Sequence, residues 1–291
     1  MKKSVNHLNR ITLVALFLMA SAISLNAQTK NMEKITTGHA PVNGINMYYE
    51  IHGEGAMPLV LIHGGGSTIE STFGNILPLL SAKNKIIAVE LQAHGRTSDR
   101  DAPESFAQDA DDVAALLRYL KVDKADIMGF SNGGSTTMQI AIRHPEVVNK
   151  IIVIAGATKR SGFIPGFFEY MPNATIADMP AFLKKDFLKV TPDEAKLQTM
   201  FEKDKQRMVT FKDWNDDDLK GIKAPALFMA ADKDVITVEH TAEMARLAPG
   251  AQLVILPGKH GAFIGEGEAN TAKDRILIGV SVTLIDEFLS E

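Results

Sequence analysis

The chain has 291 residues, of which 45% are hydrophobic and 23% are charged, proportions that suit one large globular domain. The net charge is −4, and it becomes −7 without residues 1–27, because those residues include three basic side chains and no acidic one. This acidic balance disfavours a nucleic-acid partner, and the absence of cysteine excludes disulfides, thiolate catalysis and cysteine-ligated metals.

The N-terminus has the pattern of a bacterial secretory signal. Basic side chains at positions 2, 3 and 10 precede an apolar stretch over 11–23, which at 13 residues is short for a membrane span. Ala27 then offers a small residue just before a cleavage site. We therefore predict a signal peptide over 1–27, export to the periplasm or outside the cell, and no stable membrane span after its removal. An uncleaved membrane anchor is the alternative.

Strand and helix patterns alternate along most of the remaining chain. Short apolar runs typical of strands lie at 46–52, 59–63, 85–90, 125–128, 150–155, 226–230 and 252–256. Helical spacing of apolar residues is found at 73–80, 106–120, 136–144, 238–247 and 274–289. Strands that alternate with helices predict an α/β protein with a mostly parallel sheet covered on both faces.

Residues 157–221 interrupt this alternation. The segment is rich in aromatic residues, methionine and proline, and it has no run typical of a parallel strand. We predict that it forms a helical cap inserted over the edge of the sheet where the strands end. The predicted core consists of residues 28–156 and 222–291.

A Gly-x-Ser-x-Gly pentapeptide at 129–133 lies between a predicted strand and a predicted helix. A serine in this setting occupies a sharp, strained turn, and the flanking glycines relieve the crowding there and leave the Ser131 hydroxyl exposed. The N-terminus of the following helix favours developing negative charge. A glycine-rich turn with an incidental serine is the alternative, but the strand–turn–helix setting favours a nucleophile.

A serine nucleophile needs a base, and the base needs an orienting acid. In a parallel sheet, the loops that follow the strands open on the same edge. His260 follows the last predicted strand and is the candidate base, with an exposed loop histidine as the alternative. Asp234 follows strand 226–230 and is the candidate acid. It is preferred over Asp232 because it lies further into the loop, and the unused aspartate is expected to be a turn or capping residue.

The tetrahedral intermediate of acyl transfer needs hydrogen-bond donors for its oxyanion. The backbone N–H groups of Asn132 and Gly65 are the candidates, because glycines let the backbone approach a substrate oxygen closely. A phosphate-binding loop is the alternative, but the chain has neither of the usual glycine-rich phosphate motifs. Five further residues are expected to contact the substrate: His63, Gly64, His94, Phe163 and Phe167. The two phenylalanines could instead simply pack the cap onto the core.

With these features the chain resembles the α/β-hydrolase superfamily from about residue 35 to residue 289. The order Ser131, Asp234, His260 matches the nucleophile–acid–base order of that family, and 63–66 and 90–98 match its loops. The resemblance implies an eight-stranded, mostly parallel sheet with helices on both faces and a helical cap after the sixth strand. Glu90 and Asn132 depart from the residues that many relatives carry, and neither departure removes a catalytic group.

The predicted function is hydrolysis of a small-molecule carboxylic ester through an acyl-enzyme, without a metal or organic cofactor. Alternatives within the fold are carbon–carbon hydrolysis, lactone opening, aminopeptidase activity and perhydrolysis; dehalogenation is disfavoured because that branch has aspartate in place of Ser131. A small-molecule binding module with little turnover is a further alternative. A metal enzyme has little support, because the acidic clusters at 109–112 and 216–218 have no histidine at ligand spacing.

Overall fold

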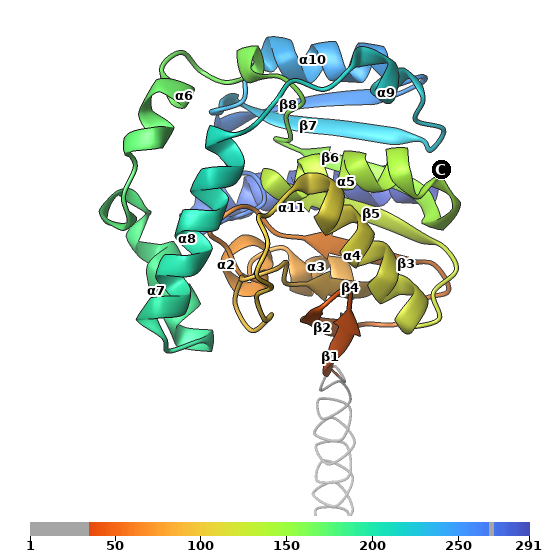
Figure 1. The fold of residues 1–291 in the computed structure, drawn as a ribbon. Helices are drawn as coiled ribbons and strands as arrows, with labels where there is room; N and C mark the ends of the chain where they lie inside the picture. Colours follow the sequence, from red (N-terminus) through yellow and green to blue (C-terminus); the bar gives the residue numbers. More distant parts are fainter. Residues whose placement is uncertain (1–34, 268–270) are drawn as a thin grey trace, which may run out of the picture. The chain divides into compact units, whose positions relative to one another are not determined.

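A computed structural model describes residues 35–267 and 271–291 of the protein (Figure 1). The predicted signal peptide at 1–27 lies outside this part of the chain, so cleavage and export stay predictions. No helix within the described residues is long and apolar enough to cross a membrane.

Eight strands form one sheet in the order β1-β2-β4-β3-β5-β6-β7-β8 (Figure 1). β1 (Thr36–Val42) and β2 (Ile45–His52) form an antiparallel hairpin, and β2 also pairs antiparallel with β4 (Lys85–Val89). The remaining strands run parallel to β4: β3 (Pro58–Ile62), β5 (Ala125–Phe130), β6 (Val148–Ile154), β7 (Ala226–Lys233) and β8 (Gln252–Lys259). This arrangement confirms the predicted eight-stranded, mostly parallel sheet.

Helices cover both faces of the sheet, and this is why its central strands are apolar throughout. Along β3, Val60 and Ile62 point into one core, whereas Leu59 and Leu61 point into the other. The first core is closed by α4 (Phe106–Tyr119), α5 (Asn132–Arg143) and α10 (Val238–Leu247). The second is closed by α2 (Ile69–Phe73), α3 (Leu77–Ser81) and α11 (Ala272–Ser290).

The prediction of a single helix over 73–80 was wrong. Two short helices, α2 and α3, occupy this part of the chain instead. Thr68 caps the start of α2, and Pro78 stands in the first turn of α3, where its missing N–H is not needed. The apolar spacing therefore continued across the boundary between the C-cap of α2 at Gly74 and the first turn of α3.

Residues 157–221 contain helices α6 (Phe167–Tyr170), α7 (Ala181–Val190), α8 (Glu194–Val209) and α9 (Asp216–Lys220), with short 3₁₀ turns before α6 and between α6 and α7. We call this segment the cap. Its apolar residues gather in two clusters, one around Phe187 that includes Ala93 of the core, and one around Phe211 that includes Phe106 at the start of α4. The cap therefore packs against loops that follow the parallel strands. The division of the chain into this cap and a separate core stays a prediction.

Candidate active site

Ser131 occupies the turn between β5 and α5. Its backbone has φ 55° and ψ −118°, a left-handed conformation that is strained for a residue with a side chain. A Cβ on Gly129 would lie 2.0 Å from the carbonyl oxygen of Gly133, and a Cβ on Gly133 would lie 2.1 Å from that of Ile62. Strand and helix approach so closely here that only glycine fits, and the turn presents the serine at the edge of the sheet.

Two side chains from neighbouring loops connect to Ser131 in a chain of hydrogen bonds. His260 Nε2 lies 3.0 Å from Ser131 Oγ, and His260 Nδ1 lies 2.6 Å from Asp234 Oδ1. Asp234 is buried, and the same oxygen also accepts the Ile236 N–H at 3.1 Å. Asp232 is exposed and accepts the N–H of Gly258 at 2.7 Å. The structure therefore brings together Ser131, His260 and Asp234 and leaves Asp232 outside.

Two carboxylates set the proton affinity of His260. Burial of the ring lowers its pKa, but the hydrogen bond and negative charge of Asp234, together with the charge of Glu266, raise the pKa above its ordinary value. Glu266 is itself close to Ser67, whose hydroxyl donates to it at 3.3 Å, and burial raises the pKa of Glu266 to about 7. An imidazole that binds a proton more tightly than usual is a stronger base toward a hydroxyl.

The loop after β3 lies against the nucleophile. A Cβ on Gly64 would lie 3.3 Å from Ser131 Cβ, and one on Gly65 would lie 2.5 Å from Asn132 Nδ2. Within the described residues, the backbone N–H groups of Gly65 and Asn132 donate to no acceptor, whereas that of Gly66 is occupied. Gly65 and Asn132 thus remain as candidate donors to an oxyanion, and that assignment stays a prediction.

A cavity of about 320 Å³ opens at Ser131 and His260, and most of its walls are apolar. The predicted contacts Phe163 and Phe167 line it, as do Phe106 from the core and other cap residues. These include Tyr170, Met171, Met179, Leu183, Met200, Phe201, Met208 and Phe211. A mostly apolar cavity with a few converging polar groups is the usual form of a small-molecule site.

The predicted substrate contacts His63, Gly64 and His94 do not line this cavity, because they are buried behind it. His63 Nδ1 donates to the Gly64 carbonyl at 2.7 Å, and its Nε2 accepts the N–H of Leu91 at 3.0 Å. Burial lowers the pKa of His63 to about 3, so the ring is neutral and ties two loops together. These three residues lie outside the walls of the cavity, so the structure gives no support to the prediction that they contact the substrate.

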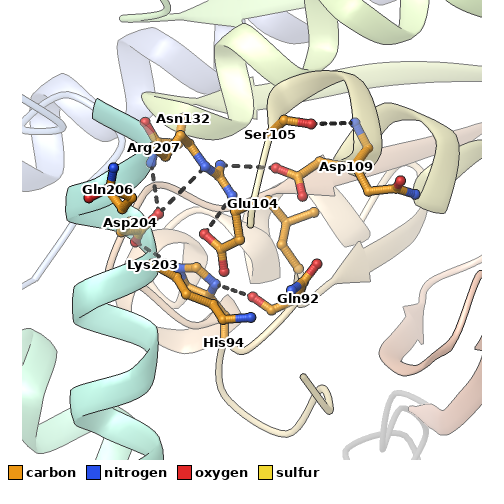
Figure 2. Close-up of polar contacts among 12 residues, drawn as sticks. Gln92, His94, Glu104, Ser105, Asp109, Asn132, Lys203, Asp204, Gln206 and Arg207 are labelled. Carbon is orange, nitrogen blue, oxygen red and sulfur yellow. Dashed lines mark hydrogen bonds and ion pairs between the residues drawn. The ribbon is translucent and has the colours of Figure 1, made fainter. Parts of the chain in front are cut away.

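Sequence reasoning missed Asp204, a cap residue on α8 that lines the cavity and reaches the loop after β3 (Figure 2). Its carboxylate accepts hydrogen bonds from the Gly66 N–H at 2.6 Å, from His94 Nε2 at 2.9 Å and from Asn132 Nδ2 at 3.1 Å. The only sequence signal was an acidic residue three positions before Arg207 on one helix face, a spacing that is common on exposed helices.

No cluster of three or more histidine or acidic residues in the described part of the chain could hold a metal ion. The expectation that the protein needs neither metal nor organic cofactor stays a prediction. The groups next to Ser131, an imidazole and a carboxylate, are the types that nucleophilic catalysis uses.

A model of the alpha/beta hydrolase family matches residues 59–269, so the chain belongs to this family. Over 225 residues it is 28% identical to the dihydrolipoyllysine-residue acetyltransferase component of the acetoin cleaving system of Pseudomonas putida, covering 72% of this chain and 60% of that protein. It is 32% identical over 123 residues to the human serine hydrolase BPHL, covering 41% of this chain and 42% of that protein. The chain thus spans about half the length of these curated relatives.

Solved structures show the same fold. The enol-lactonase from Burkholderia xenovorans LB400 superposes with a TM-score of 0.67 over 87% of this chain and the whole of that chain, at 21% identity. Other similar proteins carry the names of a 2-hydroxymuconate semialdehyde hydrolase, an N-acyl homoserine lactone degrading enzyme, a meta-cleavage product hydrolase and a thermophilic esterase. The family relationship thus supports hydrolysis of small molecules and leaves the type of bond open.

Proposed function

We propose that this protein is an exported serine hydrolase that cleaves carboxylic esters of small molecules through an acyl-enzyme. The observation that carries the proposal is the chain of hydrogen bonds from Ser131 through His260 to Asp234 at the mouth of an apolar cavity. A hydroxyl, a base and an acid in this geometry are what attack on an ester carbonyl requires.

In the proposed reaction His260 Nε2 takes the proton of Ser131 as its Oγ attacks the carbonyl carbon. Asp234 holds the ring with its proton on Nδ1 and stabilises the imidazolium that forms. The oxyanion is received by the N–H groups of Gly65 and Asn132, the second of which lies at the N-terminus of α5. His260 then protonates the leaving alcohol, and a water that it activates releases the acid.

The walls of the cavity favour an apolar acyl or alcohol group of modest size. Aromatic and methionine side chains of the cap line the cavity, and burial of apolar substrate area against them supplies binding energy of about 25 cal/mol per Å². Methionine side chains adapt to irregular shapes, which suits a site that accepts more than one acyl group.

The first test uses a fluorescent fluorophosphonate on the purified protein without residues 1–27, with the labelled residue located by mass spectrometry. We expect label on Ser131, no label in Ser131→Ala or His260→Ala, and unchanged circular dichroism in both variants. A screen of p-nitrophenyl esters, lactones and a carbon–carbon-cleavage substrate then separates the alternatives. Faster turnover of a lactone or of the carbon–carbon substrate would replace the ester assignment, and a stoichiometric burst without turnover would identify a binding module.

Export is tested separately by fractionation of cells that express the whole chain or the chain without residues 1–27. The whole chain is expected in the periplasm or the medium with its N-terminus shortened, and the truncated chain in the cytoplasm. Whole chain retained in the cytoplasmic fraction, or in the membrane with an intact N-terminus, would contradict the predicted signal peptide.

A further inference from the structure

One carboxylate of the cap contacts both sides of the candidate oxyanion hole. Asp204 on α8 accepts the backbone N–H of Gly66, the residue after the candidate donor Gly65, at 2.6 Å. It also accepts a hydrogen bond at 3.1 Å from the side-chain amide of Asn132, the other candidate oxyanion donor. The contacts bridge 138 and 72 residues of sequence, so they exist only when α8 lies against the core.

Asp204 is held as a charged group in this partly buried position. Burial would raise its pKa, but the charge and hydrogen bond of His94 and the charge of Arg207 lower that pKa well below its ordinary value. Burial lowers the pKa of His94, but the charge and hydrogen bond of Asp204, together with the charge of Glu104 and the bond to the Gln92 carbonyl, raise that pKa to about 9. His94 therefore donates from both ring nitrogens, to the Gln92 carbonyl at 2.8 Å and to Asp204 at 2.9 Å. The 3.3 Å approach of the Gly66 N–H to His94 Nε2 is then no hydrogen bond.

Arg207, one turn further along α8, fastens the same helix face to the core (Figure 2). Its guanidinium pairs with Glu104 at 2.7 Å and with Asp109 at 2.9 Å, and all three side chains are buried. Charged groups in such a place are costly unless they are paired, so the helix has one favourable position relative to the core. That position sets where the Asp204 carboxylate lies.

The loop that carries Gly65 needs such an anchor. Three consecutive glycines have wide backbone freedom, and an oxyanion hole works only when its donors are aligned before the reaction. The hydrogen bond to Asp204 fixes the peptide group that joins Gly65 to Gly66. The Asn132 side chain, held by the same carboxylate, packs directly against Gly65.

We propose that Asp204 is a positioning residue that couples the docking of the cap to assembly of the oxyanion hole. When α8 is docked, its carboxylate aligns the loop that bears the Gly65 N–H with the start of α5. When α8 moves away, the glycine loop loses that alignment, and Ser131 and His260 remain in place without a formed oxyanion hole. The inference rests on the proposed serine-hydrolase function.

The test compares Asp204→Ala with Asp204→Asn and with a matched control on the same helix, Glu202→Gln. Glu202 is exposed, and its carboxylate contacts Lys205 at 3.3 Å and accepts a hydrogen bond from the Gln198 side chain at 2.9 Å, both on the same helix, so its variant is expected to match the wild type. The measured quantities are kcat and KM for a p-nitrophenyl ester and the Ki of a trifluoromethyl ketone, whose serine adduct places an oxyanion in the hole. Thermal unfolding of each variant is followed in parallel.

Asp204→Ala is expected to lower kcat about tenfold to a hundredfold, less than the loss of an oxyanion donor itself. KM should stay within about threefold, and the Ki of the ketone should rise in proportion to the loss of kcat/KM. Asp204→Asn keeps one acceptor oxygen for the Gly66 N–H and should lose less activity than Asp204→Ala. A merely structural role would lower the unfolding temperature without changing Ki.

Wild-type kcat and Ki in folded Asp204→Ala would overturn the inference. If Asp204→Ala does not fold, Asp204→Asn carries the same comparison: a rise in Ki matched to its loss of kcat/KM supports the inference, and an unchanged Ki overturns it. Failure of the proposed function is recognised independently. It would appear as a wild-type protein that neither labels nor turns over ester, or as a Ser131→Ala variant that keeps its turnover.

Discussion

Replacing Asp234 with asparagine is the sharpest test of the proposed mechanism, because the substitution keeps the shape of the side chain and removes its charge. In the structure a single oxygen, Oδ1, accepts from both His260 Nδ1 and the Ile236 N–H. The other oxygen, Oδ2, is buried without a hydrogen-bond partner among the described residues. The asparagine amide must therefore take one of two unfavourable orientations.

If the amide oxygen faces His260, the NH₂ group is buried without an acceptor and no negative charge stabilises the imidazolium. If the NH₂ group faces His260, it donates to Nδ1, the ring proton moves to Nε2, and that nitrogen can no longer accept the proton of Ser131. Loss of the orienting acid in a serine triad costs about 10⁴ in kcat where this exchange has been made in other folds. We expect a loss of about 10³ to 10⁴ for Asp234→Asn, or about 4 to 5.5 kcal/mol of activation free energy.

The assay is kcat for the best p-nitrophenyl ester, with the rate of fluorophosphonate labelling as a second readout and circular dichroism to verify folding. Asp232→Asn is the matched control, because among the residues that the structure describes this exposed carboxylate accepts only the Gly258 N–H. The variant should change kcat less than about fivefold. A larger loss in Asp232→Asn than in Asp234→Asn would refute the assignment of the acid. Equal, small losses would refute the view that a buried carboxylate orients His260.

Three further outcomes are expected. Glu266→Gln removes a negative charge that raises the pKa of His260, so the acidic limb of the pH profile of kcat/KM should move to lower pH; an unchanged limb would contradict this. Gly133→Ala places a Cβ 2.1 Å from a backbone oxygen of β3 and should cost about 3 kcal/mol or more of unfolding free energy, whereas Gly279→Ala, in open space on α11, should gain about 0.5 to 1 kcal/mol; denaturant titration compares them. The pKa of His94 rises from 6.5 to about 9, so protonated His94 contributes up to about 3 kcal/mol to the free energy of unfolding. This contribution is complete below pH 6.5 and is lost as pH rises through about 9. Unfolding titrations of His94→Gln should lack this pH dependence.

Much of the architecture follows from local sequence. The helix predicted over 238–247 has those bounds in the structure, and the one predicted over 106–120 ends one residue earlier than expected. Both are amphipathic, so their periodicity reports directly which face is buried. The turn at Ser131 could also be predicted from sequence. The backbone is crowded there between residues that are close in sequence, and the glycines that the crowding requires form a recognisable motif.

Local patterns were insufficient where competing signals overlap. The apolar spacing over 73–80 continued across the break between α2, whose C-cap is Gly74, and α3, which has Pro78 in its first turn. Similarly, His63 and His94 follow strands at the edge of the sheet where a site is expected, yet both rings are buried behind the cavity. Position on the sheet edge is a property of sequence order, but the direction of a side chain depends on its packing.

By itself, then, the sequence determined the strand–turn–helix that presents Ser131, the order of the candidate nucleophile, acid and base, and the α/β sheet that carries them. Only the tertiary structure shows which of Asp234 and Asp232 meets His260, because the two lie in one loop. The contacts of Asp204 could not be predicted from sequence, since its partners are 138, 110 and 72 residues away. The glycine pattern around Ser131 reflects crowding between residues that are close in sequence. The role of the Asp204 carboxylate depends instead on groups that only folding brings next to it.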